Sequence, residues 1–472
     1  MLFCVCLKIE IRGENYEKPN DKKKFFFRKN RFCTVSSRSV CGIGEYLAVS
    51  ISGCQIRRRY FPAYLYHSGI DLWIYDDHGG DIVGTYDEKS PVGAFASFGN
   101  SRWSSLGGWI NAIIPVLIVP YYSVIGGWVL KYLVEYVRGH AQTVAEDGYF
   151  SAFISDGFST EICFVIFSVI TLAIIYAGVR NGIERVSKFM MPILVVLSVI
   201  IAIYSVTRPG ALAGVKYFLV PNISNFSWMT VVAAMGQMFY SLSIAMGILI
   251  TFGSYMKKET SIEESTKNVE IFDTAIAIMA GLMIIPAVFA FSGGDPDTLQ
   301  AGPALMFITI PKVFASMGFG TFAGVMFFLL VLFAALTSSI ALTESAVSTF
   351  EDELGWSRKK STVLCGMIMI ALGSLSSLGY GPLANVKIIG MQFLDFFDFL
   401  TNSVMMPIAA IATCLFVSRV VGVKRIEEEV TYGGGTFKRR KVFLFMIQYL
   451  CPIFAGIILL SSVANAFGWI SM

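Results

Sequence analysis

The sequence predicts an all-α protein that crosses a membrane many times, and three observations support this fold class. Hydrophobic residues make up 55% of the 472 residues and charged residues only 15%, whereas soluble domains carry about 25% charged residues. Nine segments without a charged residue reach or approach the length of about 20 residues that a spanning helix needs. One of them gathers serine, glycine and alanine near its centre, as interrupted helices that line a cavity do.

The nine spanning helices are expected along the uncharged segments, which are residues 103–130, 162–179, 189–207, 217–256, 274–294, 313–343, 361–386, 399–418 and 442–472. The loops that follow the first, third, fifth and seventh helices hold six basic residues, and the alternate loops hold sixteen. Because basic loops stay on the cytoplasmic side, we expect a cytoplasmic N-terminus and an external C-terminus in the cell (inner) membrane. The net charge of +4 follows from this topology and indicates no nucleic-acid partner.

The sequence contains no pattern typical of an enzyme. It has no phosphate-binding loop, zinc motif or nucleophile elbow, and its nine cysteines lack metal or redox spacing. Three histidines offer little for proton-relay or hydrolytic chemistry. We therefore expect no enzymatic activity and no organic cofactor.

Residues 236–247 (GQMFYSLSIAMG) are the polar centre of the fourth uncharged segment. An interrupted backbone at this depth indicates a binding site in the middle of the bilayer. A seam of small residues for helix packing would give the same composition. The segment alone supports both interpretations equally.

Residues 1–88 differ in composition from the remainder of the chain. They hold five of the nine cysteines and two of the three histidines, without a charge-free run of spanning length. We interpret residues from about 28 to 88 as translated in a shifted reading frame. Codons that encode residues 41–50 can be read one base later as VGLGNIWRFP. The same shift over residues 51–87 permits an apolar run long enough to span a membrane.

From about Ser90 to the C-terminus the chain resembles the neurotransmitter:sodium symporters, in the bacterial branch of sodium-dependent amino-acid transporters with eleven helices. The motifs that carry the resemblance are PYYSVIGGW (120–128), GQMFYSLSIAMG (236–247), IFDTAIAIMAGLMIIPAVFAF (271–291), LTSSIAL (336–342), FEDEL (350–354) and LDFFDFLTN (394–402). The resemblance implies a leucine-transporter-type inverted-repeat fold and a sodium-coupled amino-acid symporter that works by alternating access. Residues 1–89 would then be an aberrant segment, the frameshifted helices 1 and 2, and residues 90–472 would form helices 3–11.

One sodium site is expected in the eighth helix of the family. Thr337 and Ser338 offer adjacent hydroxyls, and Ala334 lies one turn earlier with its carbonyl. Sodium is a hard cation that prefers such oxygen ligands, and the resemblance assigns these three residues to one site. The alternative is that the hydroxyls bond back to their own helix.

The second sodium site would use Ser241 and Asp273. Ionisable residues within or bordering membrane segments are functional candidates. By resemblance, Asp273 matches a position where chloride-dependent relatives have asparagine, so its carboxylate would replace the chloride. The alternative is that Asp273 caps the start of an apolar helix at the cytoplasmic surface.

The resemblance places the substrate pocket at the interrupted sixth helix. Tyr240 would form an aromatic lid and Met246 an apolar wall, which suits an amino acid with an apolar or aromatic side chain. The residues expected to bind the substrate are Tyr240, Ser241, Ser243, Met246, Ser338 and Leu342. For the third helix the choice between Tyr121, Tyr122 and Leu117 stays open, and both tyrosines are compatible with a packing role.

Two gates are implied. Asp398 would pair with the arginine of the first helix on the outer side, above Tyr240. Asp352, near Tyr255, would pair with an N-terminal basic residue on the inner side. The alternative is that both are solvated acidic residues at helix ends.

The missing first helix would supply carbonyls to both sodium sites and hold the substrate carboxylate. We therefore expect the literal 472-residue chain to be inactive. The alternatives are a proton-coupled or exchanging amino-acid carrier of the same fold, and a non-transporting sensor or pseudogene product.

Overall fold

The computed structural model describes residues 89–98, 102–220, 245–255, 262–295, 302–431 and 440–469, with the single residues 234, 236 and 437. Within these ranges the chain is helical, and its only β pairing is an isolated antiparallel bridge between Ile388 and Met391. The expectations for residues 1–88 lie outside the described residues. So do those for Tyr240, Ser241 and Ser243.

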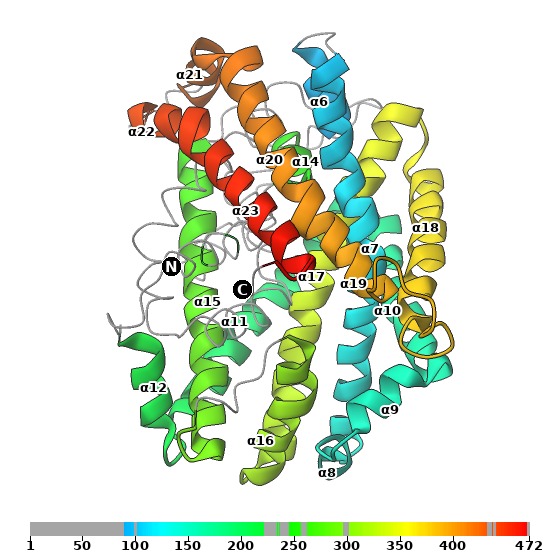
Figure 1. The fold of residues 1–472 in the computed structure, drawn as a ribbon, viewed down its shortest axis with the longest axis vertical. Helices are drawn as coiled ribbons and strands as arrows, with labels where there is room; N and C mark the ends of the chain where they lie inside the picture. Colours follow the sequence, from blue (N-terminus) through cyan, green and yellow to red (C-terminus); the bar gives the residue numbers. More distant parts are fainter. Residues whose placement is uncertain are drawn as a thin grey trace.

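Eight helical segments of the described chain are long and apolar enough to cross a membrane (Figure 1), which confirms the all-α multi-pass class. In the labels of Figure 1, with η for a π-helical stretch, they are α7 (Arg102–Val137), α10 (Gly157–Tyr176), α11 (Arg185–Val206), α15 (Ile262–Ser292), α17 (Gly320–Leu354), α18 (Arg358–Leu378), the run of α19 (Phe393–Asp398), η6 (Phe399–Met405), α20 (Met406–Leu415) and η7 (Phe416–Val421), and the run of α22 (Arg440–Phe445), η9 (Met446–Leu450) and α23 (Cys451–Ala466). The shorter elements are α6 (Pro91–Ser97), α8 (Ala141–Val144), α9 (Tyr149–Ser155), η2 (Val179–Glu184), α12 (Ala211–Leu219), α14 (Ile248–Gly253), η5 (Leu305–Thr309), α16 (Ile310–Ser316) and α21 (Val423–Thr431).

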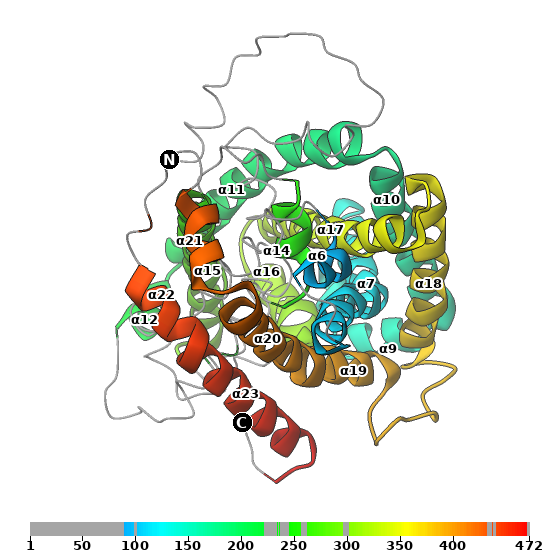
Figure 2. The same ribbon diagram turned by 90° about the horizontal axis from the view of Figure 1, so that it is seen from above.

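Three helices pack around the long helix α7. Helices α10, α17 and α18 each lie against α7, and they also contact one another. Seen from above, α7 and α17 lie toward the centre, and α10 and α18 lie at the periphery (Figure 2). On another side of the molecule, α15 packs against α11 and α12.

Close backbone approach holds α7 against α10. A Cβ atom at Gly127 would lie 2.7 Å from the backbone nitrogen of Phe164, a distance that side chains do not tolerate. Glycine at this position therefore lets the two helices come closer than any other residue would. Further along α7, the Tyr132 hydroxyl donates to the carbonyl oxygen of Phe307 at 2.8 Å, which ties α7 to η5.

The outer face of α10 is apolar and exposed. Ile162, Ile166 and Val169 follow the helical period and are exposed, whereas Phe164 and Phe167 on the opposite face are fully buried. An exposed apolar stripe on a helix of spanning length is what lipid contact requires. The burial pattern thus agrees with the composition that predicted a membrane protein.

Several helix ends differ from the uncharged segments. α7 runs to Val137, beyond the expected end at residue 130, because charged residues can continue a helix past the apolar core. The expected helix 313–343 is divided by a turn at Met317–Phe319, and α17 starts at Gly320. The segment expected to be helical to residue 386 ends at Leu378, after which the chain forms turns.

The segment expected to span the membrane at residues 217–256 is interrupted. The structure describes residues 217–220, 234, 236 and 245–255 of this segment, and residues 234 and 236 are helical. α14 begins at Ile248, directly after the non-helical residues 245–247, in which Ala245 and Gly247 have φ angles of 58° and 68°. A Cβ atom at Gly247 would lie 2.7 Å from the carbonyl oxygen of Asn111 on α7. The interrupted backbone at residues 245–247 is therefore covered by protein.

Candidate functional site

The oxygen atoms of the first expected sodium site lie in the buried middle of α17. Thr337 is 2% exposed, Ser338 is 5% exposed and Ala334 is fully buried. The Thr337 hydroxyl donates to the carbonyl oxygen of Ala334 at 2.9 Å. This is the back-bonded arrangement that we considered as the alternative, and it also brings two of the three expected ligand oxygens together. Leu342, one turn later, is buried as well.

Hydroxyl groups attach the half-helix α14 to α17. The hydroxyl oxygens of Thr251 and Ser345 lie 3.1 Å apart, and the Ser348 hydroxyl donates to the hydroxyl oxygen of Thr251 at 3.5 Å. Met246 lies in the interruption just before α14 and is 4% exposed. The chain that carries the expected apolar wall of the pocket is thus fixed to the helix that carries the expected sodium ligands.

Asp273 lies within α15 and not at its start. The helix begins at Ile262, eleven residues earlier, and the Asp273 side chain is 3% exposed. The alternative of a helix cap at the cytoplasmic surface is therefore wrong. The uncharged segment misplaced the start of the helix because residues 262–272, although partly charged, continue it. A carboxyl group at this depth costs free energy unless it has partners.

Tyr121 lies in the middle of α7, where its hydroxyl group meets polar side chains of η6. Its hydroxyl oxygen is 3.2 Å from that of Thr401 and accepts a hydrogen bond of 3.4 Å from the Asn402 amide. The same amide donates to Asp398 at 2.5 Å. Tyr121 and the expected outer gate residue thus share a partner. Tyr122 is equally buried in α7, and the choice of a substrate contact among the α7 residues stays open.

A second tyrosine, Tyr380, forms a hydrogen bond with an acidic residue of α19, the helix that also carries Asp398. The Tyr380 hydroxyl donates to Asp395 at 3.0 Å, and burial is the main cause that raises the pKa of this phenol above its ordinary value. The group therefore stays protonated and donates. The arginine and Tyr240, expected beside Asp398, lie outside the described residues.

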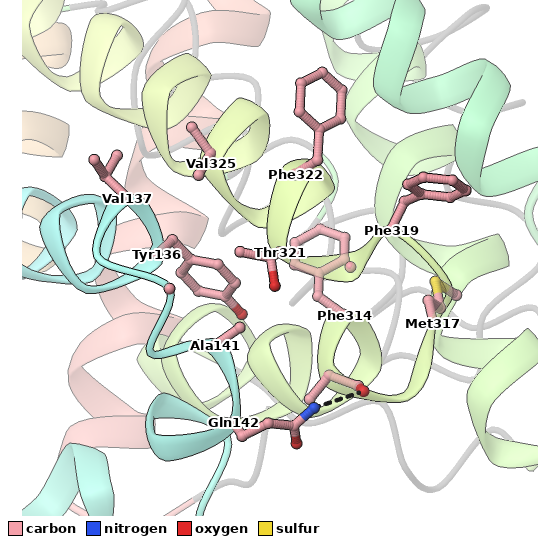
Figure 3. Close-up of a pocket in the computed structure, with 13 residues that line it drawn as sticks. Tyr136, Val137, Ala141, Gln142, Phe314, Met317, Phe319, Thr321, Phe322 and Val325 are labelled. Carbon is pink, nitrogen blue, oxygen red and sulfur yellow. Dashed lines mark hydrogen bonds between the residues drawn. The ribbon is translucent and has the colours of Figure 1, made fainter.

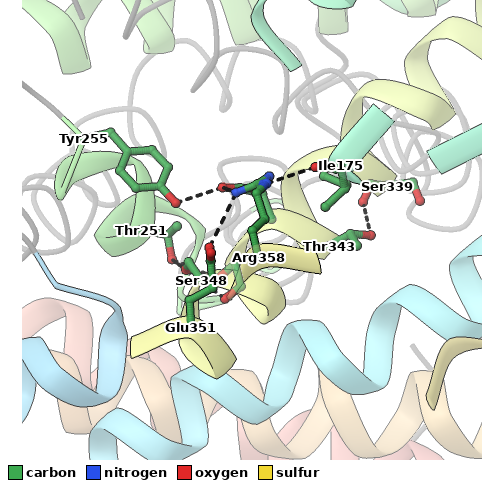
Figure 4. A network of polar contacts seen from close by, with 10 residues as sticks. Ile175, Thr251, Tyr255, Ser339, Thr343, Ser348, Glu351 and Arg358 are labelled. Atoms are coloured by element: carbon green, nitrogen blue, oxygen red, sulfur yellow. Dashed lines mark hydrogen bonds and ion pairs between the residues drawn. The ribbon is translucent and has the colours of Figure 1, made fainter. Parts of the chain in front are cut away.

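A buried network lies near the start of α18 and contains Tyr255, Glu344 and Arg358 (Figure 4). Glu344 is fully buried and accepts from the Tyr255 hydroxyl at 2.8 Å. Arg358 donates to both oxygens of Glu344, with Nη1 at 3.0 Å from Oε1. Its Nε donates to the carbonyl oxygen of Ile175 at 3.0 Å, and Glu351 lies 3.6 Å from Nη1. The network joins α14, α17, α18 and α10.

Glu344 and Arg358 were not among the functional residues predicted from the sequence. Glu344 ended an uncharged segment and was read as the edge of the membrane, whereas α17 continues for ten residues beyond it. An ionisable residue inside a long apolar helix was the available signal. Tyr255 was expected near Asp352, and its described hydrogen bond goes to Glu344. Asp352 accepts from the backbone N–H of Ser90 at 2.7 Å, and the N-terminal basic partner expected for it lies outside the described residues.

A separate cavity of about 660 Å³ lies between the end of α7, α8, α16 and the start of α17 (Figure 3). Its walls are mostly apolar, and the Gln142 amide donates to the carbonyl oxygen of Ala315 at 3.3 Å on one side. None of the expected substrate or sodium residues that the structure describes lines it. The cavity is therefore distinct from the site on α17.

Comparisons with known proteins agree on the family. The sodium:neurotransmitter symporter family matches residues 151–468. A sodium-dependent transporter of Bacillus subtilis is 31% identical over 80% of this chain and 84% of its own. A sodium-dependent transporter of Haemophilus influenzae is 29% identical over 77% and 80%. The crystal structure of MhsT in complex with L-phenylalanine superposes with a TM-score of 0.83 at 31% identity, covering 93% of this chain and 99% of that one.

Removal of Arg358 tests the buried network. Arg358→Met leaves the carboxylate of Glu344 buried without its cation, so we expect the free energy of unfolding to fall by about 3–5 kcal/mol. The double variant Arg358→Met with Glu344→Leu should recover most of this loss, because no buried charge remains. Denaturant unfolding in detergent micelles measures both.

The matched control is Arg440→Met, which removes an ion pair with Glu427 at 2.8 Å in which both side chains are more than 40% exposed. We expect this change to cost under about 1 kcal/mol. Equal losses for Arg358→Met and Arg440→Met would show that the Arg358–Glu344 pair does not stabilise the fold.

Proposed function

The chain belongs to the sodium:neurotransmitter symporter family, and from this premise we propose that its intact form imports an amino acid together with sodium by alternating access. The observation that carries the proposal is the interruption at residues 245–247, held against the buried hydroxyl-rich middle of α17. Half-helices that meet non-helical backbone in the middle of the bilayer provide free carbonyl and N–H groups for ions and substrates.

The sodium ligands follow from the chemistry of the buried oxygens. Ala334, Thr337 and Ser338 would supply a carbonyl and two hydroxyls to one ion, since a hard cation prefers oxygen ligands. Asp273 with Ser241 would hold the second ion. In both sites the remaining ligands would come from the first helix of the intact protein.

The substrate class follows from the apolar character of the described pocket residues. Met246 and Leu342 are buried and apolar, and the similar MhsT binds L-phenylalanine in its crystal structure. We therefore assign an amino acid with an apolar or aromatic side chain. Tyr240, Ser241, Ser243 and Ser338 would complete the pocket.

The two polar clusters would act as gates. The Asp398 cluster would close the outer side with the arginine of the first helix, and Asp352 would close the inner side with an N-terminal basic residue. By the distribution of basic residues, α21 and the start of α18 would lie in the cytoplasm, with the C-terminus outside. The network of Tyr255, Glu344 and Arg358 would then lie on the cytoplasmic side.

Reconstitution of two chains tests the function. The literal 472-residue chain should show no sodium-driven uptake of phenylalanine or leucine in proteoliposomes, since the frame-shifted residues cannot form the first helix. A chain with the frame restored over residues 28–88 should take up the substrate when an inward sodium gradient is applied. Uptake by the literal chain would contradict the frameshift interpretation. In the restored chain, uptake driven by protons alone would favour the proton-coupled carrier, and binding without flux would favour a sensor.

Substitution of Thr337 tests the first sodium site. In the frame-restored chain, Thr337→Val removes a proposed ligand and should raise the sodium concentration for half-maximal uptake about tenfold or more, as loss of about 1.4 kcal/mol of binding free energy does. Thr343→Val is the matched control, because Thr343 is buried in the same helix and donates to the carbonyl oxygen of Ser339 at 2.7 Å. Equal sodium dependence in the two variants would remove Thr337 from the site.

Asp273 should make transport independent of chloride. We expect uptake by the frame-restored chain to be unchanged when chloride is replaced by gluconate, since the carboxylate supplies the negative charge. Asp273→Asn removes this charge and should make uptake depend on chloride. Loss of uptake by the unsubstituted chain in gluconate would contradict the role of Asp273.

A further inference from the structure

A groove of about 810 Å³ runs between α10 and α18. These two helices lie at the periphery of the molecule (Figure 2). Its walls are almost entirely apolar and include Val169 and Leu172 on α10 and Val363, Met367 and Ile370 on α18. Val169, Val363 and Met367 are more than half exposed. The groove thus faces the surroundings of the helices and belongs to none of the clusters described above.

Small residues keep the groove open. Ala173 and Ala371 lie along it, and Gly366 forms part of its floor, where an added Cβ atom would lie 3.0 Å from the Leu172 side chain. On α18 the lining extends from Thr362 to Ala371, which corresponds to about 14 Å of helix at 1.5 Å per residue. This length is close to half of the about 30 Å hydrocarbon core. The groove therefore has the depth of one leaflet.

The end of the groove at the start of α18 is marked by basic and aromatic side chains. Lys359 and Lys360 are exposed in the first turn of α18, and the Lys359 ammonium lies 5.5 Å from the centre of the Tyr176 ring, which itself lines the groove. Trp356, just before α18, is also exposed. Tryptophan and tyrosine rings with lysine are typical of the headgroup level.

Charge at this end is available for an anion. Arg358 turns toward Glu344, whereas neither Lys359 nor Lys360 forms an ion pair within the described part of the chain. The first turn of α18 carries no acidic residue, so the helix dipole adds to the positive potential there. An apolar groove of one leaflet's depth therefore ends in two ammonium groups at the headgroup level.

We propose that this groove binds an anionic phospholipid from the leaflet that contains the start of α18. One acyl chain lies between α10 and α18, and the phosphate contacts Lys359 and Lys360. Basic pockets between membrane helices are known to recognise anionic headgroups, and each lysine near the surface contributes about 1 kcal/mol. A zwitterionic lipid carries its own cation and gains less from the two lysines.

Native mass spectrometry of the purified full chain in neutral detergent tests the proposal. The chain is titrated with dioleoylphosphatidylglycerol or dioleoylphosphatidylcholine, and bound lipid is counted. We expect selective binding of the phosphatidylglycerol. The double variant Lys359→Gln with Lys360→Gln should weaken that binding about thirtyfold, because two lysines are lost. Ala371→Trp, at an exposed position of the groove, should also weaken it.

The matched control is Lys387→Gln, which removes an exposed lysine beyond the other end of α18 and should leave binding unchanged. Equal binding of both lipids would contradict the role of the lysines. Normal binding by Ala371→Trp, or by the milder Ala371→Leu, would contradict the role of the groove. A lipid-independent dimer that Ala371→Trp dissociates would assign the groove to a second copy of the chain. The assay needs no uptake, so its result does not depend on the proposed transport.

Discussion

The structure depends on the requirement that backbone polar groups within a membrane have partners other than lipid. A helix satisfies them internally, and an interruption does so only where protein covers it. At residues 245–247 the cover comes from α7, whose Asn111 carbonyl lies against Gly247, and from α17, whose Ser345 bonds to Thr251. The position of the interruption therefore fixes where α7 and α17 must run, and both lie near the centre of the bundle.

The same constraint explains why α17 collects polar residues along one buried helix. Thr337, Ser345 and Glu344 are each buried on α17, and each has a partner on α17 or on a neighbouring element. Helices α7, α10, α17 and α18 contact one another, and Arg358 adds hydrogen bonds that join α18 to α17 and α10. These four helices thus form a unit. Within the described residues, the side-chain hydrogen bonds that attach the α14 segment to this unit come from hydroxyl groups.

The sequence predicted the helical class, the approximate spans and the residues around the interruption, because composition and charge follow directly from the lipid environment. The predicted helix ends were wrong where a helix continues beyond the apolar core into charged residues. Asp273 was placed at a helix start because the preceding residues are charged, yet α15 begins at Ile262. Glu344 was read as the end of a span for the same reason. Its partner Arg358 is fourteen residues away on the next helix, and only the packing of α17 on α18 shows that a buried carboxylate can be neutralised there.

The energies of these contacts indicate which of them can open during a transport cycle. The pair between Arg358 and Glu344 joins two charges in a buried setting, and separating it would leave the buried Glu344 carboxylate without its cation, at a cost of several kcal/mol. The bonds on the α14 side are single hydrogen bonds: the neutral Thr251 bond contributes about 1 kcal/mol, and the Tyr255 bond to the Glu344 carboxylate contributes about 1.5–3 kcal/mol. Water that reaches this end of the molecule can replace them. A motion of α14 relative to α17 would therefore break the hydroxyl bonds and leave the charged pair within the four-helix unit intact.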